Sequence, residues 1–357
     1  MKILKKLFAN KYVVESFSSK RFTLTESLIK CLKRGKSSEQ ILAADVIMLT
    51  FIQLGYSSSE AIEFLNESKQ TLIDLIDDEK VEPDVRAACA KTLGLALFVT
   101  NENSTDITGI LEKLESLFSQ SYAKGDGSIR TLPPKMYELH AAALSSWCLL
   151  LCILPLHVVN KLSQKHIKHF QDFLKSPDVD LRIVAGETIA FLFEMAQCDS
   201  HSDLSIFEDV DLIDTLKNLA NDSAKYRSKK DKKQQRSSFR DILRTIEEAE
   251  FESQTIKFGN ESLFLDNWIR KKQYETFREL LGPGMNNHLQ ENEFIRDIFD
   301  LGAPVFSSES SRKSNLASMS KMQKVQFNKE QFRSRTKSMN KKRENKDTTA
   351  GGYDEDD

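Results

Sequence analysis

The spacing of apolar residues predicts helices through the first two hundred residues of the chain. Leu24, Leu28 and Leu32 lie four residues apart, so they share one face of a helix, and Gly35 ends this stretch. A second helix is expected from Ser37, because the apolar positions after it follow the 3.6-residue period until the next glycine. The first two hundred residues therefore have a helical pattern.

Two residue pairs have the spacing of a capping box, in which a hydroxyl and a carboxylate or amide satisfy the first free amides of a helix. They are Thr23 with Glu26, and Ser37 with Gln40. We expect one helix to start at each pair.

Four of the expected helices align into a repeat. The helix starts Pro83-Asp84-Val85 and Pro177-Asp178-Val179 resemble each other, and the aligned positions are separated by 44, 54 and 42 residues. Periods of roughly 40–47 residues are typical of HEAT and armadillo arrays. Small residues followed by large apolar ones would let neighbouring helices approach closely and then interdigitate. The aligned residues, which we expect in the core, are Ala44, Ala88, Ala142 and Val184, followed five positions later by Leu49, Leu93, Trp147 and Ile189.

These observations predict an all-α fold with an armadillo- or HEAT-like helical repeat solenoid over residues 1–224, which is expected to fade after Gln197. An irregular helical bundle with coincidental spacing is the alternative. Only 13 glycines and 7 prolines are present, which argues against a turn-dense all-β fold.

Three further segments are expected after the solenoid. Residues 225–250 form a basic segment and a connecting helix from Phe239 to about Glu250, and residues 251–305 form a small, mostly helical C-terminal domain. Within that domain Thr255–Phe258 is expected to be extended and to end at Gly259, and two helices are expected around Gly282–Gly284.

The last segment, residues 306–357, has few aliphatic residues, many serines, twelve basic and eight acidic residues. Such a composition buries too little apolar area to offset the entropy of ordering the chain. We therefore expect a disordered basic tail with an acidic end, Asp354–Asp357.

Charge and cysteine content limit the functional classes. The net charge of −2 excludes a chain that binds nucleic acid through its overall charge, although a local basic patch is still compatible with it. Five cysteines without paired spacing favour a reducing compartment over a disulfide scaffold. The apolar run Leu149–Leu154 is too short to span a bilayer, and Lys5 and Lys6 interrupt any signal-peptide core, so the protein is expected to be intracellular and not secreted.

The sequence contains no P-loop, dinucleotide fingerprint, nucleophile elbow or HExxH motif. His166 and His169 lie three residues apart, but no nearby cluster completes a metal site, so both are expected to be solvated surface residues. Cys148 and Cys152 are expected to be small core residues. We assign no catalytic residue, metal ligand, cofactor or small-molecule substrate.

Two basic stretches, one from Lys225 to Arg240 and one in the tail that includes Arg333 to Arg343, are the features that indicate a function. Each could contact phosphates or, as an extended basic peptide, a nuclear import receptor; for the first stretch a solvated loop and helix start is the alternative. In the tail, Phe327 and Phe332 are available for base stacking. The candidate contact residues are Lys225, Arg227, Lys229, Lys230, Lys232, Lys233, Arg236, Arg240, Arg333, Arg335, Lys337, Lys341, Lys342 and Arg343.

Several segments resemble the interferon-related developmental regulator family, in collinear order from about residue 10 to 305. The N-terminal ones are Phe22–Ser27, Cys31–Ser37, Ala185–Glu187, Leu192–Glu194 and Lys232–Asp241, and the C-terminal ones are Thr255–Gly259, Trp268, Gly282–Met285, His288–Gln290 and Asn292–Phe294. Family members usually open with a polar segment and another helical repeat, so the first helix pair here is expected to lack a cap.

The resemblance implies an armadillo-type fold without enzymatic activity. It also implies a regulatory role in transcriptional co-repressor complexes or, for some relatives, in ribosome binding and translational repression. Our leading hypothesis is a protein-interaction scaffold, a transcriptional co-regulator whose groove holds segments of protein partners. The alternative is a translation repressor that uses the basic tail to bind the ribosome or other RNA. Nucleus and cytoplasm are the expected locations.

Overall fold

The computed structural model describes residues 1–14, 20–55, 59–100, 104–198, 204–207, 209–221 and 229–304. Contacts divide the chain into two units, Met1–Pro304 and Val305–Asp357, and the second lies outside the described residues. The expected tail, including its six candidate contact residues, is therefore a prediction that the structure does not address.

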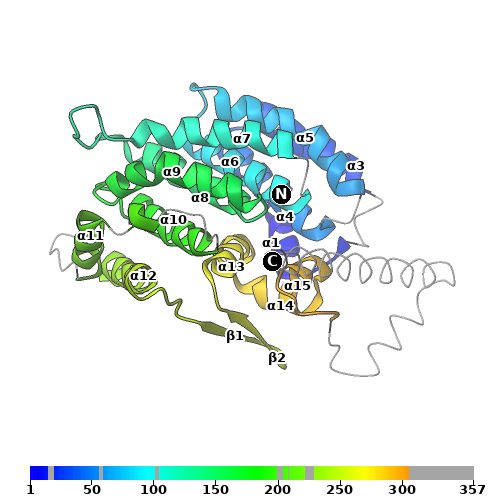
Figure 1. Ribbon diagram of the computed structural model, residues 1–357. Coiled ribbons are helices and arrows are strands. Elements are labelled where there is room, and N and C mark those ends of the chain that lie inside the picture. The colour runs from blue at the N-terminus through cyan, green and yellow to red at the C-terminus, as the bar shows by residue number, and fades with distance from the viewer. Residues whose placement is uncertain are drawn as a thin grey trace, which may run out of the picture. The chain divides into compact units, whose positions relative to one another are not determined.

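Five pairs of helices stack side by side in the described part of the first unit (Figure 1). In each pair the first helix lies in an outer layer, and the second lies in an inner layer whose neighbours pack against one another. This arrangement confirms the predicted all-α helical repeat fold. The pairs are α3 (Arg21–Arg34) with α4 (Ser37–Leu54), α5 (Ser59–Asp77) with α6 (Pro83–Thr100), α7 (Ser104–Phe118) with α8 (Pro134–Leu151), α9 (Leu156–Phe173) with α10 (Val179–Gln197), and α11 (Val210–Asn221) with α12 (Lys229–Glu248).

The inner helices are apolar around most of their circumference because they are covered on both sides. Small residues let them approach closely: a Cβ on Gly94 of α6 would lie 2.7 Å from the Cβ of Ser146 on α8. All eight residues of the aligned repeat lie on inner helices. Val184 is half-buried, and the buried residues are Ala44, Leu49, Ala88, Leu93, Ala142, Trp147 and Ile189.

The helix starts differ from two expectations. Helix α3 begins at Arg21, so Thr23 lies inside the helix and its hydroxyl does not cap it. Helix α4 does begin at Ser37, but the cap is one residue earlier than expected. The backbone N–H of Lys36 donates to the carboxylate of Glu39 at 3.1 Å, so the reciprocal bond does not involve Gln40.

The repeat array also does not fade at Gln197. Helix α12 starts ten residues before the expected Phe239 and forms the inner helix of a fifth pair. A tertiary contact explains the longer helix: the buried guanidinium of Arg182 on α10 donates to the side-chain oxygen of Gln235, with Nη2 at 2.7 Å. A Cβ on Gly186 of α10 would lie 2.7 Å from the Phe239 ring, so this glycine permits the close packing of α12.

The C-terminal segment folds back over the inner layer. Strands β1 (Gln254–Phe258) and β2 (Glu261–Leu265) pair antiparallel, and helices α13 (Trp268–Leu281), α14 (Met285–Glu291) and α15 (Glu293–Ile298) follow, with the 3-10 turn η4 (Gly282–Gly284) before α14. The extended stretch and the two helices around η4 occur where expected, whereas the second strand was not predicted. Because α13 packs against α4, α8 and α10, the expected divisions at residues 225 and 251 do not separate compact units.

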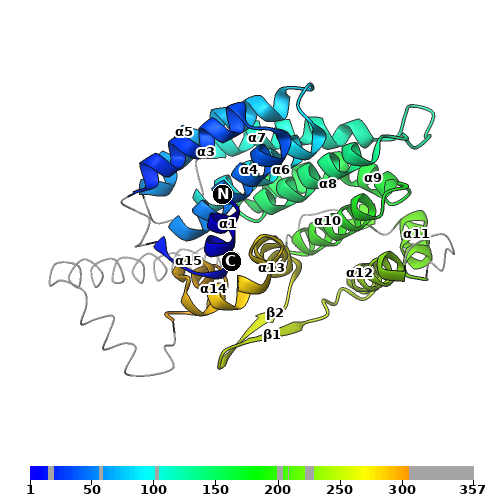
Figure 2. The same ribbon diagram turned by 180° about the vertical axis from the view of Figure 1, so that it is seen from behind.

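Helix α1 (Lys2–Asn10) joins the two ends of the unit. It packs between α4 and the α13–α14 region, and both views place it beside α14 and α15 (Figures 1 and 2). The imidazole Nε2 of His288 lies 3.0 Å from the Phe8 carbonyl oxygen, and a Cβ on Gly284 would lie 1.9 Å from the Ala9 carbonyl oxygen. Helix α4 of the first pair is thus covered by α1 and by the C-terminal segment.

Candidate interaction surfaces

Helix α12 separates an apolar face from a basic face. Gln235, Phe239 and Ile242 are buried against the neighbouring helices. Lys233, Arg236 and Arg240 follow at spacings of three and four residues, so they share one side of the helix, which is turned away from these buried residues. Lys233 and Arg240 are exposed, and Arg236 is half-buried, with Nε donating to the Lys232 carbonyl at 3.2 Å.

Ion pairs on α12 occur beyond Arg240. In the C-terminal half, Arg244 pairs with Glu252, and Glu247 pairs with Lys217 at 2.7 Å. No ion pair of the described residues involves the three cations Lys232, Lys233 and Arg240. We call Lys233, Arg236 and Arg240, together with the half-buried Lys232 at the edge of the apolar face, the basic face of α12. Its charge is uncompensated by the part of the fold that the structure describes.

The structure therefore places four of the fourteen candidate contact residues fully. Lys229 and Lys230 lie on the first turn of α12, but their side chains are not described. Lys225 and Arg227 lie outside the described residues, as do the six tail residues Arg333, Arg335, Lys337, Lys341, Lys342 and Arg343.

The inner face of the solenoid, which we expected to hold partner segments, is partly covered by α13. The backbone N–H of Trp268 donates to the Glu194 carboxylate at 2.9 Å. Lys272 Nζ donates to Ser145 Oγ at 2.6 Å, and Lys91 Nζ pairs with Glu279 at 2.6 Å. The chain's own helix thus occupies much of the groove formed by α6, α8 and α10.

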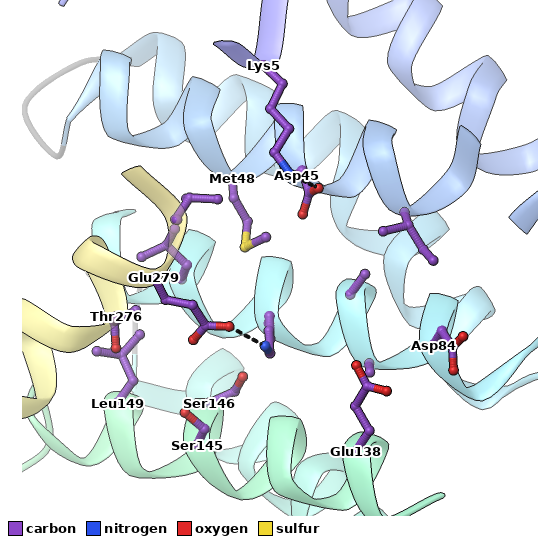
Figure 3. A pocket seen from close by; sticks show the side chains of 16 residues that line it. Lys5, Asp45, Met48, Asp84, Glu138, Ser145, Ser146, Leu149, Thr276 and Glu279 are labelled. Atoms are coloured by element: carbon purple, nitrogen blue, oxygen red, sulfur yellow. Dashed lines mark hydrogen bonds and ion pairs between the residues drawn. The ribbon is translucent and has the colours of Figure 1, made fainter. Parts of the chain in front are cut away.

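A cavity of about 380 Å³ remains between α13 and the inner helices (Figure 3). Helices α1, α4, α6, α8 and α13 all contribute to its walls. Its apolar lining consists of Ile41, Met48, Ala87, Ala88, Leu95, Leu149 and Leu280. Nothing in the sequence indicated this cavity, because its walls come from segments as far apart as residues 5 and 280.

The charged groups of this cavity are unevenly paired. Lys5 pairs with Asp45 at 2.6 Å, and Lys91 pairs with Glu279. Asp84 pairs with Lys135 at 2.8 Å through Oδ2, while its Oδ1 is buried without a hydrogen-bond partner. Glu138 is exposed and has no ion-pair partner among the described residues. One end of the cavity therefore carries two carboxylates, of which the exposed Glu138 has no ion-pair partner among the described residues.

A charged cluster lies beneath α13, close to the half-buried Val184. Burial is the main cause that raises the pKa of Glu187 to about 7, and repulsion from Glu275 adds to it. Lys271 is buried, with Nζ 4.3 Å from the centre of the Trp268 ring and 3.4 Å from the Asp241 carboxylate. The α10–α13 interface thus contains a carboxyl group that changes charge near neutral pH.

The expectation of a solvated His166 is wrong, whereas His169 is exposed. His166 Nδ1 lies 2.6 Å from the Tyr122 hydroxyl, and Nε2 lies 3.2 Å from the Glu115 carboxylate. A surrounding cage of aromatic rings excludes water from this histidine, and no local sequence pattern showed that those rings would converge. They belong to Phe118, Trp147 and Phe170.

The described residues contain no group of three or more histidine, cysteine or acidic side chains placed to hold a metal ion. Cys148 is buried, and Cys152 is half-buried and packs against the core. Burial raises the pKa of the Cys148 thiol to about 11, which keeps it protonated near neutral pH. Within this described part of the chain, no helix is both long enough and apolar enough to cross a membrane.

Two family models match the chain. The model described as interferon-related developmental regulator matches residues 1–247, which include α1 to nearly the end of α12. The model described as interferon-related protein conserved region matches residues 292–347. This second range begins inside the expected C-terminal domain and continues through most of the expected tail.

Curated relatives match over nearly the whole chain. Interferon-related developmental regulator 1 of Sus scrofa is 39% identical over 342 residues, which are 96% of this chain and 75% of the relative. The human protein of that name is 38% identical with the same coverage of both chains. Interferon-related developmental regulator 2 of Mus musculus is 36% identical over 96% of this chain and 76% of its own length.

Proposed function

Because the chain belongs to the interferon-related developmental regulator family, we propose that it is a non-enzymatic helical-repeat scaffold that regulates gene expression by binding the RNA of a ribosome. The basic face of α12 is the observation that carries this proposal. Its cations have no ion-pair partners in the described fold, and they are held on a helix that the solenoid fixes in place.

The position of these cations supports a role in binding. Because Lys232, Lys233 and Arg240 make no ion pair among the described residues, they do not stabilise α12 through charge pairing. Phosphate contacts would release condensed counterions and supply affinity independent of base sequence. Lys233 and Arg240 are separated by about 10 Å along the helix axis, so the face can contact more than one phosphate.

The test is co-sedimentation of the full-length protein with ribosomes at two salt concentrations. The variant K232Q/K233Q/R236Q/R240Q removes four charges from the basic face of α12. The variant K124Q/K161Q/K168Q/K175Q removes the same number from exposed lysines elsewhere. We expect the first variant to bind at least tenfold more weakly and with a shallower salt dependence, and the second to bind like the unchanged protein. Equal binding by both variants would reject α12 as the contact.

Deletion of residues 306–357 separates α12 from the basic tail. If both regions contact RNA, the tail-deleted protein keeps part of its affinity, and the α12 substitutions remove the remainder. If the tail alone carries binding, its deletion abolishes co-sedimentation while the α12 substitutions have no effect. That result would move the proposed contact from the described fold to the tail.

A second candidate function is transcriptional co-regulation through protein partners, and the open cavity beside α13 favours it. Both functions together correspond to a protein present in the nucleus and the cytoplasm, with the basic segment read by an import receptor. Fractionation of cells followed by co-purification tests this candidate. Recovery with chromatin-associated proteins supports it, and recovery only with ribosomal fractions rejects it.

A further inference from the structure

The cavity bounded by α1, α4, α6, α8 and α13 combines an apolar floor with an acidic end (Figure 3). Figure 3 shows Glu138 directed from α8 toward the end of the cavity where Asp84 lies, with Glu279 and Thr276 of α13 on the opposite side. The volume of about 380 Å³ lies within the range of small-ligand sites, which is enough for a few side chains and too small for a whole helix.

The charges select the class of ligand. Four carboxylates and two ammonium groups line the cavity, and both ammonium groups are already paired, Lys5 with Asp45 and Lys91 with Glu279. Of the other two carboxylates, Asp84 is paired with Lys135 through Oδ2 and its Oδ1 atom is buried, so the exposed Glu138 carboxylate is the one left to accept hydrogen bonds from a ligand. A phosphate would be repelled here, so this surface does not fit the RNA that suits α12. A guanidinium or ammonium group would supply the missing donors.

We propose that this cavity binds an arginine- or lysine-containing apolar segment of a protein partner. The cation lies against the Glu138 carboxylate at the acidic end of the cavity, and the neighbouring apolar side chains of the partner pack on Met48, Ala87 and Leu149. Arginine is favoured over lysine, since its planar group donates two parallel hydrogen bonds to one carboxylate. This proposal rests on the second candidate function, because it names the chemistry of the protein partner that the groove accepts.

The probe is a fluorescein-labelled, end-blocked peptide with the sequence Ala-Leu-Arg-Leu-Ala, compared with the same peptide carrying norleucine in place of arginine. Fluorescence anisotropy measures the binding of each peptide to the full-length protein. We expect the arginine peptide to bind at least fivefold more tightly than the norleucine peptide. The exposed Glu138 is the first residue to change, since E138Q removes its charge without disturbing the core.

We expect E138Q and D84N each to weaken the binding of the arginine peptide at least fivefold and to leave the binding of the norleucine peptide unchanged. The matched control is E112Q, because Glu112 is an exposed carboxylate on α7 that does not line the cavity. Equal affinity of the two peptides, or an E138Q variant that binds like E112Q, would overturn the proposal. Displacement of the peptide by a short RNA would overturn it too, because the site would then accept phosphate.

The two proposals fail separately. The α12 variant described above is expected to bind the arginine peptide normally, and E138Q is expected to co-sediment with ribosomes normally. If chromatin-associated proteins co-purify equally with E138Q and the unchanged protein, the cavity assignment fails while co-regulation stands. If E138Q loses peptide binding and no chromatin-associated protein co-purifies at all, the site stands and the co-regulatory function fails.

Discussion

The side-chain amide of Asn292 donates to the carbonyl oxygen of Ile52 at 3.0 Å, and both residues are fully buried. This bond joins the last turn of α4, in the first helix pair, to the start of α15, 240 residues later. Asn292 also caps α15, because its side-chain oxygen accepts from the Ile295 backbone N–H at 3.2 Å. The C-terminal helices are therefore part of the closure of the solenoid rather than an appended domain.

Asn292 provides the first prediction. N292A removes these two bonds and the contact of the amide nitrogen with His288 Nδ1 at 3.2 Å, and it leaves the Ile52 carbonyl buried without this partner. We therefore expect a loss of about 2–4 kcal/mol in the free energy of unfolding. N292D keeps the cap acceptor but turns a buried carboxylate oxygen toward the Ile52 carbonyl oxygen, so we expect it to lose at least as much stability as N292A. Urea unfolding measures both changes. Equal stability of all three proteins would contradict the assigned role of the bond to Ile52.

Arg296 provides the second prediction. Its side chain is fully buried, and it makes two bonds to the Glu261 carboxylate, at 2.7 and 2.9 Å. It also donates to four carbonyl oxygens, those of Leu289, Leu301, Gly302 and Ala303. R296M leaves Glu261 and these carbonyls without their partner, so we expect the free energy of unfolding to fall by about 3–5 kcal/mol. The exposed Arg278 is the control, and R278M is expected to change stability by less than about 0.5 kcal/mol in the same urea titration.

Glu187 provides a prediction about pH. Its pKa is raised to about 7 in the folded protein, above the ordinary value of 4.5, so folding favours the protonated form. The stabilisation that protonated Glu187 supplies is complete below pH 4.5 and is lost as the pH rises through 7. E187Q cannot ionise, and we expect it to be more stable than the unchanged protein by about 1–3 kcal/mol at pH 8, with little difference at pH 4.5.

Chemical denaturation at the two pH values measures this difference. Because Glu275, Asp241, Lys271 and Lys272 act on Glu187 from the elements packed around it, the same experiment with K272Q is informative. Loss of a nearby cation is expected to raise the pKa of Glu187 further. A constant stability difference between E187Q and the unchanged protein across this range would show that Glu187 does not titrate at the α10–α13 interface.

Glu115 gives the opposite pH dependence. Its burial favours the neutral form, but the His166 ring close to it and hydrogen bonds from Lys165 and Trp147 outweigh this effect and lower its pKa from 4.5 to about 2. The stability that this ionised carboxylate supplies is complete above pH 4.5 and is lost as the pH falls toward 2. We expect E115Q to lower the free energy of unfolding by about 1–3 kcal/mol at pH 7. The difference in stability from the unchanged protein is expected to become smaller in acid. Thermal unfolding at pH 7 and pH 3 measures this trend.

Helix α13 limits how much of the groove a partner segment can contact. The sequence hypothesis treated the whole groove as open to partner segments, but Trp268, Lys272 and Glu279 attach α13 to the inner helices. The cavity next to Glu138 remains open on this face. A partner that needs a longer groove would have to displace α13, which would break the ion pair and the two hydrogen bonds that those residues make.

The sequence by itself determined the helices and their repeat. The 3.6-residue period is a local property, and the alternation of small and large residues from Ala44 to Ile189 recurs because each inner helix meets the same kind of neighbour. Even the glycine of the Ala185–Glu187 segment, noted as a family feature, has a packing reason, since Gly186 faces Phe239. The basic character of α12 was also visible, because charge is a property of composition.

Tertiary structure alone decided where the C-terminal segment lies and what it leaves open. Lys91 and Glu279 are 188 residues apart, and the pairing of such distant groups follows from the shape of packed surfaces rather than from any local pattern. For the same reason the sequence misplaced His166 and the start of α12, both of which depend on side chains contributed by other helices. Periodicity predicts which face of a helix is buried, but only the packed structure shows which residues cover that face.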